Sequence, residues 1–156
     1  MDTSYYCKID DIKQLNYYHS DNVRWLDPVN DYELIKHYFR YFNVHNPTDT
    51  YFGISLENMK YDWSDKGTSI GKMCAYIANN KILSFAAVEY NTSDIWEIRA
   101  VSSRPDCLNN GYSKCVCSYI AKYILEHDKQ AICETNISNF AMQSVTQKIG
   151  MVQYNP

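Results

Sequence analysis

The chain has 156 residues, of which 46% are hydrophobic and 21% are charged, a composition that excludes a disordered or fibrous protein. This length fits one domain with a core of useful size. The net charge of −3 excludes the basic surface that binds nucleic-acid phosphates, and it is compatible with a cationic or amine-bearing partner.

Apolar runs and cysteines bear on the cellular compartment. No apolar run approaches the roughly 18 residues that a membrane span needs, and residues 1–11 lack the basic and apolar regions of a secretory signal. We therefore expect a cytoplasmic protein without a membrane partner. The six cysteines have no spacing typical of a disulfide framework, so we expect buried thiols and no metal site. They are Cys7, Cys74, Cys107, Cys115, Cys117 and Cys133.

The first half of the chain gives the weaker structural signals. Residues 11–19 suggest a short helix, and 31–42 suggest a better one with an amphipathic pattern. Residues 50–55 have strand character, and 57–71 are polar and typical of a loop. The apolar face of the 31–42 helix consists of Ile35, Tyr38, Phe39 and Phe42.

Tyrosine is dense in this half. Two interpretations stay open: the rings pack with their hydroxyl tips in water, or they form an aromatic substrate pocket. The tyrosines concerned are Tyr5, Tyr6, Tyr17, Tyr18, Tyr32, Tyr38, Tyr41, Tyr51 and Tyr61.

Three runs in the middle of the chain predict strands, over 72–78, 81–90 and 95–102. Asn79 and Asn80 separate the first two, and asparagine tolerates the positive φ that a two-residue hairpin turn requires. Short connections between neighbouring strands predict an antiparallel meander.

Two helices follow, over 111–127 and 138–150, each with apolar residues at three- and four-residue spacing. Ser138 or Asn139 is the expected N-cap of the second.

Short apolar runs after each helix predict strands over 129–136 and 151–154. The strand–helix–strand unit over roughly 95–135 requires a parallel pair, because a crossover helix returns the chain in the same direction. The sequence therefore predicts a mixed sheet.

The stretch "PDCLNNGYSK" (105–114) places a glycine in a polar turn at the start of a helix. This turn is either an ordinary loop or a cradle of backbone N–H groups that holds an anion at the positive end of the helix dipole. A Cβ at Gly111 would obstruct the close approach of a phosphate.

Two motifs together decide between these interpretations. "VSSRPDCLNNGYS" and "NFAMQSVTQKIGM" resemble the two cofactor motifs of the GNAT superfamily, the acetyl-CoA-dependent N-acyltransferases, over about residues 72–156. The positions in register are Val101, Pro105, Asp106, Cys107, Asn109, Asn110, Gly111, Tyr112 and Ser113 in the first motif, and Asn139, Ala141, Lys148, Gly150 and Met151 in the second.

The resemblance implies an α/β fold with a mixed, mostly antiparallel central sheet, a splayed parallel pair and flanking helices. It also implies a single domain over 1–156. Within it, 1–71 would supply acceptor-side helices and a loop, and 72–156 would form the cofactor-binding core.

Acetyl-CoA is the implied cosubstrate, with no metal. Backbone groups near Ala100, Val101 and Ser102 would pair with the pantetheine arm, and Asn139 and Met142 would contact the cofactor from the second helix. The pyrophosphate would bind at the turn, which consists of Leu108, Asn109, Asn110, Gly111, Tyr112, Ser113 and Lys114. Leu108 departs from the family, which usually has Arg or Gln there, and this predicts weaker binding.

The implied reaction is direct attack of a primary amine, carried by a small molecule or a peptide, on the thioester. Glu97 is the candidate general base, because some members of the family carry a catalytic glutamate there; alternatively it is a solvated residue on the polar face of its strand. Thr146 stands where many relatives have the tyrosine that protonates the departing thiolate.

Two other functions stay open: a sensor that binds acyl-CoA without turnover, and an interaction module that uses the tyrosine-rich first half. The sequence also leaves open the identity of the acceptor and whether two copies form a homodimer.

Overall fold

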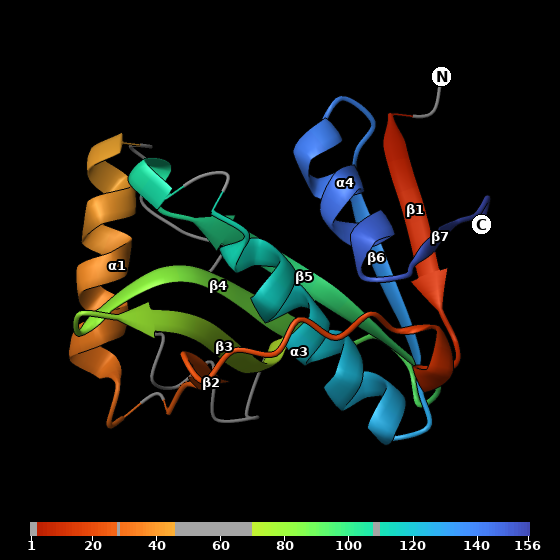
Figure 1. Cartoon of the computed structure of the whole chain (residues 1–156), viewed down its shortest axis with the longest axis horizontal. Helices are drawn as coiled ribbons and strands as arrows, with labels where there is room; N and C mark the ends of the chain where they lie inside the picture. The colour runs from red at the N-terminus through yellow and green to blue at the C-terminus, as the bar shows by residue number, and fades with distance from the viewer. Residues whose placement is uncertain (1–2, 28, 46–69, 108–109) are drawn as a thin grey trace.

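The computed structural model describes residues 3–27, 29–45, 70–107 and 110–156 (Figure 1). Within these residues seven strands form one sheet in the order β2-β3-β4-β5-β6-β1-β7. The strands are β1 Ser4–Ile9, β2 Val23–Trp25, β3 Ile70–Ala78, β4 Lys81–Tyr90, β5 Ile95–Ser103, β6 Gln130–Asn136 and β7 Val152–Gln153. The α-helices are α1 Tyr32–His45, α3 Tyr112–Glu126 and α4 Phe140–Lys148, and short 3-10 turns cover Ile12–Gln14 and Pro105–Cys107. No helix in this part of the chain is long and apolar enough to cross a membrane.

The predicted meander is confirmed. Strands β3, β4 and β5 pair antiparallel in succession. Asn79 and Asn80 close the β3–β4 hairpin with φ values of 52° and 58°, the left-handed conformation that asparagine tolerates. Strands β5 and β6, joined by α3, form the one parallel pair of the described sheet, so the predicted mixed sheet is confirmed as well.

Helices α1 and α3 cover opposite faces of this sheet. Alternate residues of a strand point to opposite faces, and in β4 they belong to two separate core clusters. Ala86 and Val88 pack in a cluster with the apolar side of α3, whereas Phe85 packs in a cluster with Ile35 and Tyr38 of α1. Helix α4 packs on the α3 side.

The first half differs from the prediction. The helix predicted over 11–19 is wrong: only the 3-10 turn Ile12–Gln14 forms there. Strands β1 and β2 were not predicted, and β1 pairs with both β6 and β7, so part of the segment assigned to the acceptor side lies inside the sheet. The strand predicted over 50–55 lies outside the described residues, as does the 57–71 loop up to residue 69.

Strands β5 and β6 separate soon after they pair. Their registered pairs run only from Ile95 to Glu97 of β5, although both strands continue beyond this point. Figure 1 shows the two strands diverging between α3 and α4. A β-bulge in β5 accompanies the separation, since its register with β4 shifts between Arg99 and Ser102, and Ala100 has a φ of 63°.

Candidate functional site

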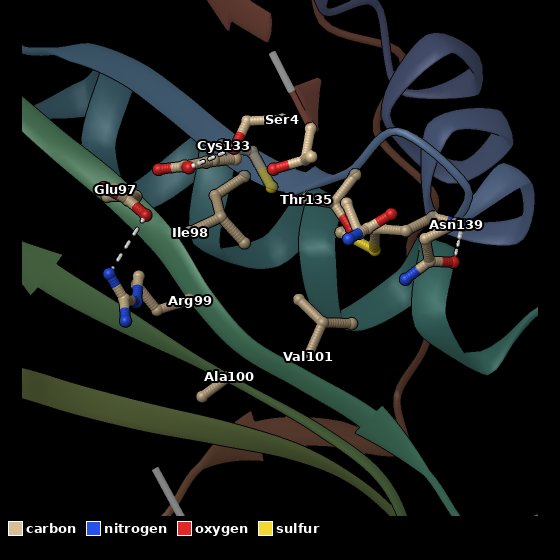
Figure 2. A pocket seen from close by; sticks show the side chains of 13 residues that line it. Ser4, Glu97, Ile98, Arg99, Ala100, Val101, Cys133, Thr135 and Asn139 are labelled. Carbon is tan, nitrogen blue, oxygen red and sulfur yellow. Dashed lines mark hydrogen bonds and ion pairs between the residues drawn. The ribbon is translucent and has the colours of Figure 1, made fainter. Parts of the chain in front are cut away.

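A cavity of about 480 Å³ opens where β5 and β6 diverge; we call it the splay cavity. In Figure 2 the side chains of β5 line one wall, those of β6 line another, and Asn139 lies beside α4. Four of the predicted cofactor-binding residues and the candidate base are among its lining residues. The lining is Thr3, Ser4, Glu97, Ile98, Arg99, Ala100, Val101, Cys133, Glu134, Thr135, Asn136, Asn139 and Met142.

The bulge shapes the β5 wall of this cavity. Ala100 and Val101 have no registered partner in β4 or β6. A bulge leaves its extra residue outside the ladder, and here that residue faces a gap rather than another strand. An extended ligand with amide groups can pair with such an edge, as a peptide pairs with a sheet.

Glu97 is a buried carboxylate on the same wall. It is 5% exposed, so the interpretation of Glu97 as a solvated residue is wrong. The Nδ2 group of Asn91 donates to Oε1 of Glu97 at 2.8 Å, and Nη1 of Arg99 lies 3.5 Å from Oε2. Burial is the largest influence and raises the pKa of Glu97 above its ordinary value, although the Asn91 hydrogen bond and the Arg99 charge oppose this shift.

A second carboxylate, Glu134, contributes to the β6 wall. Its Oε1 accepts a hydrogen bond of 2.8 Å from the Ser4 hydroxyl, which β1 carries. The sequence interpretation missed Thr3 and Ser4 because it missed β1. The signal was present in the alternation of Tyr5, Cys7 and Ile9, all buried, with the less buried residues between them.

A second cavity, of about 490 Å³, lies at the N-terminus of α3; we call it the helix cavity. Its lining includes five residues of the predicted pyrophosphate turn. The lining is Ser103, Cys107, Asn110, Gly111, Tyr112, Ser113, Lys114, Ala141, Ser144, Val145 and Lys148.

Gly111 is the N-cap of α3, with a φ of 79°. This left-handed conformation is the reason a glycine is needed here, because an L-residue with a side chain is strained there. Glycine also offers no side chain to cap the N–H groups of the first helical turn. In contrast, the side chain of Asn139 caps α4 by accepting from the Met142 N–H at 3.1 Å, which confirms the predicted N-cap.

The charges of the helix cavity suit an anion. Lys114 and Lys148 both line it, and the first turn of α3 has no acidic residue. A lysine near a helix N-terminus opposes the helix dipole, so this arrangement is stabilised when an anion binds between them.

Other predicted site residues lie elsewhere. Ser102 lines neither cavity; its hydroxyl bonds to that of Tyr38, and its carbonyl accepts from Ser84. Thr146 is fully buried, its hydroxyl donates to the Gln143 carbonyl at 2.9 Å, and it lines neither cavity. The position predicted for a general acid is therefore a core position.

Leu108 and Asn109 lie outside the described residues. Among the described residues, no group of His, Cys, Asp or Glu side chains could hold a metal ion. The sequence interpretation did not assign Ser103, Cys107 or Ser144 to the site, although all three lie within the two motifs, because a motif does not show which side chains face a cavity.

No family model and no curated protein matches the chain. Solved structures match it well. A GNAT-family protein from Novosphingobium aromaticivorans has a TM-score of 0.70 at 8% identity, over 97% of this chain and 60% of that one. An aminoglycoside acetyltransferase from an uncultured soil sample, in complex with sisomicin, has a TM-score of 0.61 at 11% identity, over 81% of this chain and 85% of that one.

An aminoglycoside 6'-N-acetyltransferase complexed with coenzyme A has a TM-score of 0.55 at 13% identity, over 69% of this chain and 57% of that one. The chain thus spans about three fifths of the length of the first and third of these proteins. At these identities the likeness concerns the fold alone. The chain has the fold of the GNAT acetyltransferases.

Proposed function

We propose that the chain is an N-acetyltransferase that moves an acetyl group from acetyl-CoA to a primary amine. The observation that carries this proposal is the divergence of β5 and β6 directly after Glu97, which opens a cavity beside a buried carboxylate. Acetyl-CoA would supply an acetyl group already activated as a thioester.

The two cavities fit the two parts of this cosubstrate. The helix cavity would hold the phosphates between the first turn of α3, Lys114 and Lys148. The splay cavity would hold the pantetheine arm against the bulged segment at Ala100 and Val101. Helix α4 lines both cavities, since Met142 faces the first and Val145 the second, so one elongated ligand can lie along it.

Glu97 would act as the general base. An amine with a pKa of about 10 is neutral to only about one part in a thousand at pH 7, which adds roughly 4 kcal/mol to the barrier. Glu97 takes one proton from the ammonium form of the acceptor, directly or through a water, and the neutral nitrogen then bonds to the acetyl carbon and loses its second proton to solvent. The raised pKa brings the carboxylate closer to the pKa of the acceptor and makes it a stronger base. The bond from carbon to sulfur breaks, and the thiolate leaves without help from Thr146.

The acceptor would be an amine that is positively charged in solution. Glu97 and Glu134 both line the splay cavity, and among the lining residues that the structure describes Arg99 is the one lysine or arginine. Arg99 also lies 3.2 Å from Glu89, so its charge is shared between two carboxylates. Small-molecule and peptide amines both satisfy this requirement.

A second candidate function is a sensor that binds acyl-CoA without turnover. Two observations favour it: Leu108 replaces the usual Arg or Gln of the family, and Thr146 is buried away from the cavity. An interaction module that binds no acyl-CoA is the third.

One experiment separates these functions. Acetyl-CoA is titrated into the protein by calorimetry, and thiol release is then followed with a panel of diamines, amino acids, aminoglycosides and peptides. The proposal expects binding and amine-dependent release of thiol. Binding without release with any amine would support the sensor, and no binding would leave the interaction module.

A further inference from the structure

Three serines form a continuous chain of hydroxyls from the core to the helix cavity; we call Ser84, Ser103 and Ser113 the hydroxyl chain. Ser113 Oγ lies 2.9 Å from Ser103 Oγ, and Ser103 Oγ lies 2.8 Å from Ser84 Oγ. Ser84 Oγ lies 2.8 Å from the Ser102 carbonyl oxygen, where the hydroxyl chain ends. Ser103 and Ser113 line the helix cavity, whereas Ser84 is fully buried.

Each hydroxyl has one hydrogen to donate, and this fixes which serine donates to which along the hydroxyl chain. A carbonyl oxygen only accepts, so the hydrogen of Ser84 points to Ser102. Ser103 then donates its hydrogen to Ser84 Oγ, because two hydroxyl oxygens at this distance need a hydrogen between them. Ser113 must therefore donate to Ser103, and all three bonds are made only in this direction.

The direction decides what Ser113 offers to a ligand. With its hydrogen held by Ser103, its hydroxyl presents only lone pairs to the cavity, and lone pairs repel a phosphate oxygen. If Ser113 turns its hydrogen to an anion, one bond of the hydroxyl chain is lost, and this loss reduces the gain from the new bond.

We infer that Ser103 is a positioning residue that limits the affinity for anionic ligands in the helix cavity by holding the hydroxyl hydrogen of Ser113. This inference rests on the proposed function, because the ligand that probes it is coenzyme A. It concerns only the side chains, and it leaves the backbone N–H groups of α3 as the main anion donors.

Loss of a polar contact beside a binding site usually weakens ligand binding, but here we expect loss of the Ser103 hydroxyl to strengthen the binding of coenzyme A. In Ser103→Ala the Ser113 hydrogen is free to bond a phosphate oxygen, and Ser84 keeps its bond to Ser102. Coenzyme A should then bind roughly fivefold more tightly, the ratio that corresponds to one net hydrogen bond. A merely structural role of Ser103 would weaken binding instead.

The test measures the dissociation constant of coenzyme A by calorimetry, with thermal unfolding of each variant to confirm the fold. Ser113→Ala should show no gain in affinity, because the hydroxyl hydrogen that the gain needs is absent. The double variant should match Ser113→Ala, since the gain needs both changes. Ser103→Thr keeps a hydroxyl and should restore the affinity of the wild type.

Ser144→Ala is the matched control, because Ser144 lines the same cavity but is not part of the hydroxyl chain. It should give no gain in affinity. The inference is overturned if a folded Ser103→Ala binds coenzyme A no more tightly than the wild type, or if the gain persists in the double variant. Failure of the wild type itself to bind would instead refute the proposed function, and the inference with it.

Discussion

Replacing Glu97 with Gln tests the chemistry most sharply. Glutamine keeps the size of the side chain, and its carbonyl oxygen can still accept from Asn91, but it cannot take a proton. A positioned general base contributes about 10²–10⁴ in rate. We therefore expect kcat/KM at pH 7 to fall by roughly 10²–10³, within the thousandfold that deprotonation of the amine requires.

The pH profile separates a base from a structural role. Burial raises the pKa of Glu97, so the wild-type activity should fall with decreasing pH at values above the ordinary range of a glutamate, and Glu97→Gln should lack this limb. The loss should shrink as the pH rises towards the pKa of the acceptor, because the amine then needs no base. Thiol release with one fixed amine, followed from pH 5 to about 10, measures both.

The thermal stability of Glu97→Gln checks that any loss of activity does not come from unfolding. A carboxyl group whose pKa is raised by folding is favoured in its protonated form, so its ionisation costs stability as pH rises through its unfolded and folded pKa values. Glu97→Gln should thus unfold at pH 7 no lower in temperature than the wild type. Glu134→Gln, in the same cavity, is the matched control and should lose far less activity. Comparable losses in both variants, or a loss that does not depend on pH, would refute the assignment of Glu97.

Three further substitutions test other parts of the account. Thr146→Ala removes a buried hydroxyl that donates to the Gln143 carbonyl and also interacts with the Cys7 thiol, so we expect turnover within about twofold and a melting temperature lower by about 2–4 °C; a large loss of turnover with intact cofactor binding would contradict this. Gly111→Asn should weaken binding of coenzyme A without loss of stability, since asparagine tolerates a positive φ. Gly111→Val should weaken binding and also lower the melting temperature. Unchanged affinity in both variants would refute the assignment of this turn as the phosphate site. A Cβ at Gly71 would lie 2.1 Å from a ring carbon of Tyr90, so Gly71→Ala should destabilise the fold by about 1–3 kcal/mol in urea unfolding, and an unchanged midpoint would show that the ring moves freely.

Local signals in the sequence predicted most of the second half. The Asn79–Asn80 turn, the amphipathic stripe of α3 and the cap at Asn139 all depend on neighbours within a few residues, so residue type and spacing suffice. Strand β1 was missed because its partners lie far away in the chain: Cys7 pairs with Cys133 and Gln153. Such pairing leaves only a weak alternation in the local sequence.

The tyrosines of the first half illustrate the same limit. The rings of Tyr5 and Tyr38 are buried in the core, but their hydroxyl tips are not in water as the packing interpretation expected: that of Tyr38 bonds to Ser102, and that of Tyr5 accepts from Gln147. Tyr17 and Tyr18 are more exposed, and each lies under a lysine, Lys122 and Lys114 respectively. Composition alone could not separate these environments.

The candidate site was predicted in part. The motifs located the α3 turn and the end of β5, because a family pattern fixes positions along the chain. A pattern does not fix which side of a helix faces a cavity, and α4 turns Thr146 inward while Met142 lines the splay cavity. Nor does it give burial: Glu97 lies between its registered partners Glu89 of β4 and Ile132 of β6, a placement that depends on long-range pairing.

The central claim is that acetyl-CoA binds along the gap between β5 and β6 with its phosphates at the start of α3. Titration of acetyl-CoA into isotope-labelled protein, followed through backbone amide signals, tests it most directly. We predict saturable shifts concentrated at Gly111 to Lys114 and at Ala100 and Val101, with little change at His127 and Asp128, beyond the opposite end of α3 from Gly111. Absence of binding, or shifts located away from both cavities, would contradict it.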